Sequence, residues 1–213
     1  SLENSTEMIS RILKELNEIE KNNDVRIIYA CESGSRAWGF ASEDSDYDIR
    51  FIYVHSKDWY LTLADKRDVI EIPFDGELDI NGWDIKKSLK LLRKSNSPLL
   101  EWLSSPIKYR NVSSVMDAYV ELSAAAFLPE SSCHHYLSMA HNTIENFKDG
   151  QEVGLKSYLY SLRTILCCKW IVSRLIQPPM KIQDLLNEFL PSGELRELID
   201  KLISSLENFI TKY

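Results

Sequence analysis

Two aspartates in the N-terminal part of the chain, Asp46 and Asp48, are spaced so that they could act together on one ligand. They stand two positions apart at the start of the apolar run 47–54, and in a strand such positions project from the same face. Two carboxylates this close repel each other unless a cation lies between them. Their oxygens are the ligands that Mg²⁺ prefers, with Mn²⁺ as an alternative ion. The spacing therefore predicts a divalent metal site.

A Gly-Ser pair, Gly34-Ser35, precedes these carboxylates and directly follows the β-branched and aromatic segment 24–32. Gly34 permits a tight turn and lets a ligand approach the backbone, because it has no Cβ. Ser35 offers a hydroxyl and an N–H group at the start of the next helical turn, where a phosphate binds well. A metal site beside a phosphate site predicts a binding site for a nucleoside triphosphate.

The same residues also have a simpler interpretation, because a surface turn rich in Ser, Asp and Gly needs no function. The order of the elements favours the nucleotide site: the Gly-Ser pair follows one predicted strand, and a second apolar strand follows the acidic pair. Haloacid dehalogenase-type phosphatases and many glycosyltransferases also use Asp-x-Asp, but they place it at the end of an apolar strand. The present sequence has the opposite order.

The elements that must position these residues can be predicted from the hydrophobic pattern. A helix at the N-terminus is expected to lead into strands over 24–32 and 47–54, which are rich in β-branched and aromatic residues. The segments 69–74 and 77–83 are predicted to pair as a hairpin joined by a tight Asp75-Gly76 turn. These strands account for all the strand signals that we find.

From Asp84 onward the pattern changes to helices, which continue to the end of the chain. We therefore predict an α+β fold, in which a small mixed β-sheet with flanking helices is followed by an all-helical C-terminal half. The corresponding domains are 1–108 and 109–213. The mixed domain carries all the residues of the predicted site.

Composition limits the classes of partner. The formal net charge of −7 and the isoelectric point of about 5.2 argue against a protein that holds duplex nucleic acid by bulk electrostatics. No apolar run is long enough to span a bilayer, and we find no charged-then-apolar leader, so no membrane partner and a cytoplasmic location are expected. The four cysteines lack metal-binding spacing and indicate a reducing compartment.

The motif resembles that of the DNA polymerase β-like nucleotidyltransferase superfamily, whose members share a Gly-Ser pair, a short helix and an Asp-x-Asp that opens a strand. Here these are Gly34-Ser35 and Asp46-Tyr47-Asp48. Longer segments, 34–54, 78–106 and 158–171, resemble one branch, the RlaP or YcgL-type family of predicted nucleotidyltransferases, named for a proposed place in RNA repair. The resemblance extends from about Asp24 to Phe189.

This resemblance implies a two-metal nucleotidyl transfer, with two Mg²⁺ ions or Mn²⁺ as cofactors. A hydroxyl of an RNA end, a protein or a small molecule would attack the α-phosphate of a nucleoside triphosphate, and pyrophosphate would leave. RNA is a candidate acceptor only through the family name, since the acidic composition gives it no support. The alternative is a non-catalytic nucleotide sensor, or a module on the same fold that regulates a partner.

The resemblance also implies a third carboxylate from a neighbouring strand, which would ligate the catalytic metal with Asp46 and Asp48. We favour Asp79, inside the predicted strand 77–83, over Asp84, which stands where the next helix must begin and suits an N-cap. The family pattern places Arg36 beside the phosphate-binding Ser35, where it could contact the triphosphate. Arg50, on the face of Asp46 and Asp48, either does the same or neutralises them.

The helix that follows Asp84 carries the most basic run of the chain. Its apolar residues Ile85, Leu89 and Leu92 are expected to face the core. Its lysines then form a solvated surface, or they border the cleft and attract a polyanionic acceptor such as an RNA end. The sequence favours the solvated surface.

The C-terminal half contains one arginine of interest, Arg163, on a long and otherwise largely apolar helix. It either reaches a phosphate in the cleft or forms a structural ion pair, and the sequence does not separate these interpretations. Three histidines on another helix lack the spacing of a zinc site and receive no role. They are His134, His135 and His141.

Overall fold

The computed structural model describes residues 2–145, 147 and 154–208. The first part of the chain alternates strands with helices, and the last part is helical. In order, the elements are α1 (Leu2–Asn23), β1 (Arg26–Glu32), α2 (Gly34–Trp38), β2 (Tyr47–Val54), α3 (Lys57–Tyr60), β3 (Val69–Ile72), β4 (Leu78–Asp84), α4 (Ile85–Leu92), α5 (Ser97–Leu103), β5 (Lys108–Asn111), α6 (Ser113–Ala125), α7 (Pro129–Glu145), α8 (Leu155–Arg174), α9 (Ile182–Phe189) and α10 (Glu194–Asn208).

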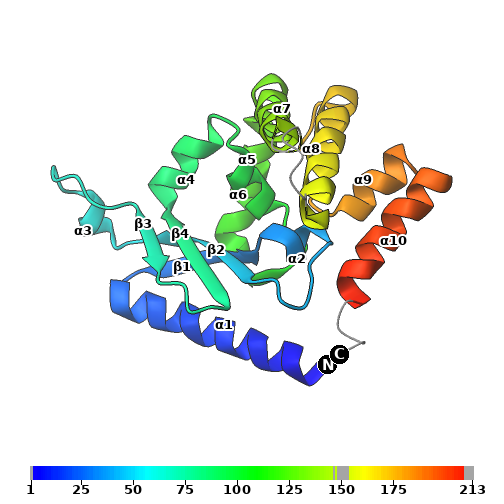
Figure 1. The fold of residues 1–213 in the computed structure, drawn as a ribbon. Coiled ribbons are helices and arrows are strands. Elements are labelled where there is room, and N and C mark those ends of the chain that lie inside the picture. The colour runs from blue at the N-terminus through cyan, green and yellow to red at the C-terminus, as the bar shows by residue number, and fades with distance from the viewer. Residues whose placement is uncertain (1, 146, 148–153, 209–213) are drawn as a thin grey trace.

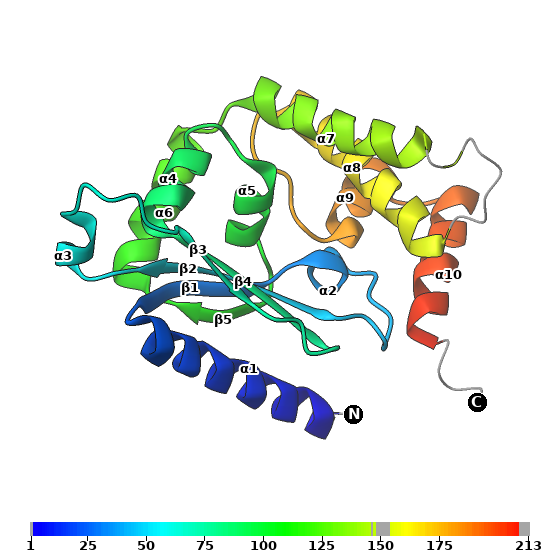
Figure 2. The same ribbon diagram turned by 60° about the vertical axis from the view of Figure 1, so that its left-hand side comes forward.

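The five strands form one mixed sheet in the order β3-β4-β2-β1-β5. Figure 1 labels β1 to β4, and Figure 2 also labels β5. β2 and β4 run parallel to each other, and every other pair of neighbours is antiparallel. The chain between β2 and β4 passes through α3 and β3, so that β4 returns in the direction of β2. The α+β class, with a small mixed sheet and a helical C-terminal part, is confirmed.

Helices cover both faces of the sheet (Figure 2). On one face α1 contributes Ile12 and Leu16 to a core with Ile49, Phe51 and Ile80. The opposite face packs against α4, α5 and α6. Side chains alternate between the two faces of a strand. In β2 and β4 the residues of the α1 core stand at alternate positions, so the residues between them must point to the opposite face. Two of the predicted carboxylates, Asp48 and Asp79, are among them.

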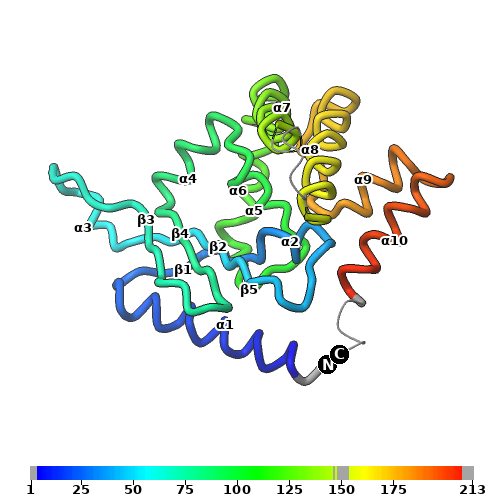
Figure 3. Tube along the Cα trace, in the orientation of Figure 1, coloured from blue at the N-terminus to red at the C-terminus, as the bar shows by residue number. Residues whose placement is uncertain are grey.

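The helical part, α7 to α10, has a core of its own, in which Tyr136, Cys167, Ile182 and Leu185 are fully buried. Phe40, which follows α2, is buried in this same core. The backbone trace shows α8 beside α2 (Figure 3), where the rings of Trp38 and Tyr160 lie 5.2 Å apart. The helical part is therefore packed directly against the segment that contains the predicted phosphate-binding turn.

Strand β5 was not predicted, because we expected no strand after Asp84. It pairs with β1 at the edge of the sheet, although its sequence, KYRN, is short and mostly polar. Edge strands are often short and charged, so the apolar pattern on which we relied is weak in this one. A domain boundary after residue 108 would divide β5, and a division that keeps the sheet whole would fall after Asn111.

Two smaller expectations also need correction. β3 and β4 do pair as an antiparallel hairpin, but five residues connect them, 73–77, and the turn is not the tight two-residue type. On α4, Leu92 is buried as expected, whereas Leu89 is 40% exposed. Ser88 takes the buried position, and its hydroxyl bonds with that of Tyr119. The buried face of α4 therefore contains Ser88 where Leu89 was expected.

Candidate functional site

The sheet brings two of the predicted carboxylates together. In the parallel pairing of β2 with β4, Asp48 is the direct register partner of Asp79. The flanking residues Ile49 and Ile80 are buried in the α1 core, so both carboxylates belong to the opposite face. Asp46 lies one residue before β2, at the same end of the sheet, and is exposed.

Arg50 lies between these two carboxylates. One terminal nitrogen is 2.9 Å from Asp79 Oδ2 and 3.7 Å from Asp48 Oδ1. The other donates to the backbone oxygen of Asp79 at 2.9 Å, and Asn81 donates to Asp79 Oδ1 at 3.0 Å. Burial raises the pKa of Asp48, and the charges of Asp79 and Asp46 act in the same direction, whereas Arg50 opposes them. The site thus gathers negative charge that needs a cation, and Arg50 supplies one.

The turn between β1 and α2 lies against Asp48. The N–H of Ser33 donates to the backbone oxygen of Asp48 at 2.7 Å. Gly34 has a φ of +61°, and a Cβ at this residue would lie 2.0 Å from Asp48 Oδ2. The next residue, Ser35, is partly exposed, and its carbonyl accepts the N–H of Gly39. Gly34 is therefore needed both for the backbone conformation and for the close approach of the carboxylate.

Glu32, the last residue of β1, is a buried carboxyl group beneath this turn that the sequence analysis missed. Its Oε1 accepts the N–H of Asp48 at 2.8 Å, and its Oε2 accepts the hydroxyl of Tyr109 at 2.7 Å. Burial raises its pKa to about 7, although both of these hydrogen bonds oppose the increase. A glutamate directly after the apolar run IIYAC of β1 was the signal that could have identified it. It fixes the start of β2, and hence Asp48.

Arg36 holds the loop that carries Asp46. Its guanidinium donates to the backbone oxygens of Ser45, at 2.6 Å, and of Asp46, at 3.3 Å, and it lies 3.8 Å from the centre of the Tyr47 ring. The side-chain hydroxyl of Ser45 is bound as well, by Lys156 of α8 at 2.7 Å. Sequence analysis missed Lys156, which no motif marks. Two cations, one from each part of the chain, therefore meet at the residue before Asp46.

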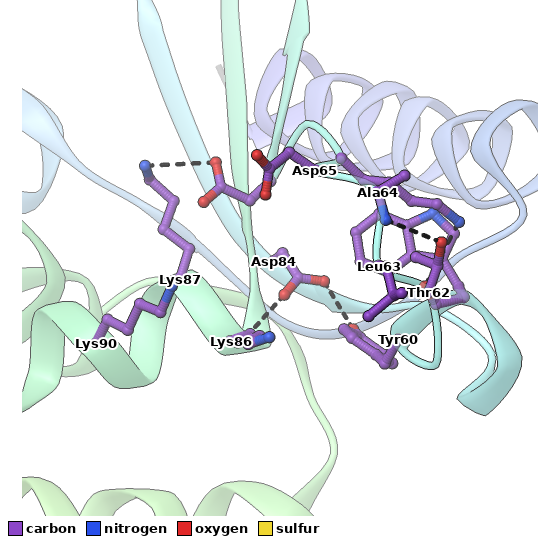
Figure 4. Close-up of a pocket in the computed structure, with 12 residues that line it drawn as sticks. Tyr60, Thr62, Leu63, Ala64, Asp65, Asp84, Lys86, Lys87 and Lys90 are labelled. Carbon is purple, nitrogen blue, oxygen red and sulfur yellow. Dashed lines mark hydrogen bonds and ion pairs between the residues drawn. The ribbon is translucent and has the colours of Figure 1, made fainter.

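Asp84 lies apart from these groups. It caps α4, accepting the N–H of Lys86 and the hydroxyl of Tyr60, each at 2.7 Å, and it is 1% exposed. It lies five positions after Asp79 along β4, which at about 3.3 Å per residue is a distance of about 16 Å. Asp84 also lines a pocket of about 250 Å³ with Lys87 and Lys90 (Figure 4), and none of the three predicted site carboxylates lines that pocket. Asp84 thus has the structural role that an N-cap implies.

Arg163 forms a structural ion pair. It is 1% exposed and donates to Glu101 Oε1 at 2.7 Å and to the backbone oxygen of Met180 at 2.8 Å. Glu101 also accepts the hydroxyl of Tyr136, at 2.8 Å, and the indole N–H of Trp38, at 3.1 Å. This buried network joins α2, α5, α7 and α8, and of the two interpretations of Arg163 the structure supports the ion pair.

Two observations bear on metals and membranes. Over the described ranges, no three His, Cys, Asp or Glu side chains are gathered closely enough to hold a metal ion, and the cysteines are unpaired. Nevertheless, Asp48 and Asp79 offer hard oxygen donors side by side, and the Arg50 cation between them shows that the pair accommodates positive charge. None of the described helices is long and apolar enough to cross a membrane.

Comparisons with known proteins show which family the sequence belongs to. The sequence pattern of RlaP, described as "RNA repair pathway DNA polymerase beta family", matches residues 8–211. "Uncharacterized protein YcgL" of Bacillus subtilis (strain 168) is 48% identical over 196 residues, which are 92% of this chain and 75% of that protein. The solved structure of a nucleotidyltransferase-like protein from Exiguobacterium sibiricum 255-15 is 12% identical, with a TM-score of 0.35. The match covers 92% of this chain and 73% of that one.

Proposed function

Because the chain belongs to the RlaP family, the RNA repair pathway DNA polymerase beta family, we propose that it transfers a nucleoside monophosphate to a hydroxyl acceptor. The observation that supports this most is the register of β2 with β4, which sets Asp48 beside Asp79. The Gly34 turn touches Asp48 Oδ2 from the other side. A nucleoside triphosphate with its metal ion needs carboxylates that bind the metal and, beside them, a turn that binds the phosphates.

In the proposed reaction, the acceptor oxygen forms a bond to the α-phosphorus of the triphosphate. The bond from that phosphorus to the bridging oxygen breaks, and pyrophosphate leaves with the electron pair. Divalent ions, two Mg²⁺ in the proposed scheme, would neutralise phosphate oxygens and lower the pKa of the acceptor hydroxyl. Asp46 and Asp48 would hold both ions. Asp79 would hold the one nearer the acceptor and help to remove the proton of the acceptor hydroxyl. Glu32 keeps Asp48 in place through the N–H of its backbone.

The triphosphate would lie on the Gly34-Ser35 turn. Because Gly34 has no Cβ, the turn lies directly against the Asp48 carboxylate, so a phosphate on the turn would lie beside a metal ion held by Asp48. Ser35 adds a hydroxyl on a partly exposed residue. Arg36 holds the loop between this turn and Asp46, and its charge favours phosphate at the same place. The acceptor is a hydroxyl of an RNA end, a protein or a small molecule.

A nucleotide sensor without catalysis is the second candidate, and one observation favours it. Both carboxylate oxygens of Asp79 already have partners, Arg50 on one and Asn81 on the other. If these contacts persist when nucleotide binds, Asp79 is not free to serve the acceptor hydroxyl. The protein would then bind nucleoside triphosphate and release no pyrophosphate.

One assay separates the two candidates. The protein is incubated with each of the four α-labelled nucleoside triphosphates, Mg²⁺ and a panel of acceptors that includes RNA with a free 3′ hydroxyl and the protein itself. A transferase releases pyrophosphate and moves the label to one acceptor. Mg²⁺-dependent binding of nucleotide without either product supports the sensor, and the absence of binding contradicts both candidates.

Replacing Gly34 by alanine is expected to damage the site more than the fold. A Cβ there overlaps the end of the Asp48 side chain, which can rotate away, so the stability cost is mainly that of the left-handed backbone, about 1–2 kcal/mol. The displaced carboxylate should lower transfer by about 10²-fold, as misplacement by about 1 Å can do. Urea denaturation and pyrophosphate release measure the two effects.

Gly76→Ala is the matched control. Gly76 also has a positive φ, of +98°, but its added Cβ meets no atom within 4 Å. It should lose a similar free energy of unfolding and keep its activity. If the two variants lose activity equally, contact between Gly34 and Asp48 is not what the site requires.

A further inference from the structure

We propose that Arg50 is a resident cation of the carboxylate pair, and that it competes with a divalent metal ion for Asp48 and Asp79. This inference rests on the proposed function, because it concerns the metal site that transfer needs. In the metal-free chain Arg50 would keep the two carboxylates aligned. Metal would bind to Asp79 only as the guanidinium moves away.

The contacts of Arg50 place its charge between the carboxylates. Its two terminal nitrogens have different partners: one donates to the backbone oxygens of Ile49, at 3.0 Å, and Asp79, at 2.9 Å. The other faces the carboxylates, 2.9 Å from Asp79 Oδ2 and 3.7 Å from Asp48 Oδ1. Thus one half of the guanidinium is held by the strands, and the other half lies where the oxygens of the pair converge.

A metal ion that bridges the pair would compete with the guanidinium for these oxygens. Mg²⁺ binds carboxylate oxygens at about 2.0–2.1 Å with strict octahedral geometry, so an ion that bridges Asp48 and Asp79 needs the space that Arg50 now fills. The charges of the ion and of Arg50 also repel each other at this distance. The remaining Asp79 oxygen is engaged by Asn81, which leaves the Arg50 side as the one to be exchanged.

The surroundings permit such an exchange. The side chains of Arg50, Asp48 and Asp79 are 18%, 26% and 36% exposed, so water and ions reach all three. An arginine side chain is long and has several rotatable bonds, and its contacts to the backbone oxygens can be replaced by water.

Arg36 provides the matched comparison, because it is the other arginine at the site. It also lowers the pKa of Asp48 by its charge, but its guanidinium donates to the backbone oxygens of Ser45 and Asp46 and to neither carboxylate of the pair. Arg36→Gln therefore removes a charge near the site while Arg50 stays between the carboxylates, and the glutamine amide keeps an N–H donor for the loop oxygens that Arg36 now binds. Removing Arg50 both takes away a charge and empties the space between Asp48 and Asp79.

The test is the affinity for Mn²⁺ alone, measured from the electron paramagnetic resonance of the free ion. Arg50→Gln should bind Mn²⁺ at least about tenfold more tightly than the unchanged protein, and Arg36→Gln less than about threefold more tightly. Arg50→Lys, which keeps the charge but not the planar fork, should lie between Arg50→Gln and the unchanged protein. In the unchanged protein, saturating Mg²⁺ should shift the ¹⁵N resonance of Arg50 Nε.

Each other outcome has a definite meaning. Weaker binding in Arg50→Gln would show that Arg50 supports the metal site, and unchanged binding would show that it does not compete with the ion. An equal gain in Arg36→Gln would show a general charge effect. Each of these results overturns the competition and leaves the proposed function standing. If neither the unchanged protein nor any variant binds Mn²⁺, the proposed function itself is contradicted. If Arg50→Gln does not fold, an Arg50 resonance unmoved by saturating Mg²⁺ overturns the competition on its own.

Discussion

Asp48→Asn is expected to lower nucleotidyl transfer by about 10³-fold or more, because it removes a carboxylate that both metal ions would share. The substitution keeps the size of the side chain, and the contacts of the Asp48 backbone with Ser33 and Glu32 do not involve the carboxylate. The fold should therefore persist. Loss of activity can then be assigned to the lost charge.

The measurement is single-turnover pyrophosphate release at saturating nucleotide and Mg²⁺, with circular dichroism as the check on folding. Asp44→Asn is the control, since Asp44 lies in the same acidic loop, is exposed and bonds to the hydroxyl of Ser42. It should retain activity within about twofold, as expected for an exposed surface substitution. Full activity in Asp48→Asn would exclude Asp48 as a metal ligand and with it the proposed mechanism.

Arg163→Met should lower the free energy of unfolding by about 3–5 kcal/mol, the usual cost of leaving one partner of a buried ion pair alone. Arg163 and Glu101 have side chains that are only 1% and 8% exposed, so water cannot replace the lost partner. The indole of Trp38 and the hydroxyl of Tyr136 would remain as the side-chain donors to Glu101.

Urea denaturation of a double-mutant cycle tests this expectation. Adding Glu101→Gln to Arg163→Met should recover part of the loss, because no unpaired charge is then buried. Arg67→Met breaks the exposed pair with Glu71 and should cost at most about 1 kcal/mol. Equal costs for Arg163→Met and Arg67→Met would mean that the buried pair contributes no more than a surface pair.

Much of the fold could be predicted because its strong elements have strong local patterns. The strands that carry Asp48 and Asp79 have apolar residues at alternating or continuous positions, and the long helices have clear periodicity. β5 has neither, since its four residues are held by pairing with β1, a contact between segments about eighty residues apart. Pairing of that kind leaves little trace in a short local segment.

The candidate site divides in the same way. The motif identified Gly34, Asp46 and Asp48, and the hairpin pattern indicated Asp79. The contact between Arg50 and Asp79 depends on the register of two strands, and that between Lys156 and Ser45 on the docking of α8. Both are tertiary contacts between residues far apart in the chain, and no local pattern indicates them.

The ends of α2 have different partners, and this has a consequence for motion. Gly34 begins the helix against Asp48, whereas Trp38 ends it bonded to Glu101 in the buried network. The next residue, Gly39, accepts a hydrogen bond from Gln183 of the helical part at 2.8 Å. The short helix α2 thus connects the two parts of the chain directly. Any displacement of the helical part relative to the sheet would therefore be transmitted through α2 to the Gly34 turn, which lies against Asp48.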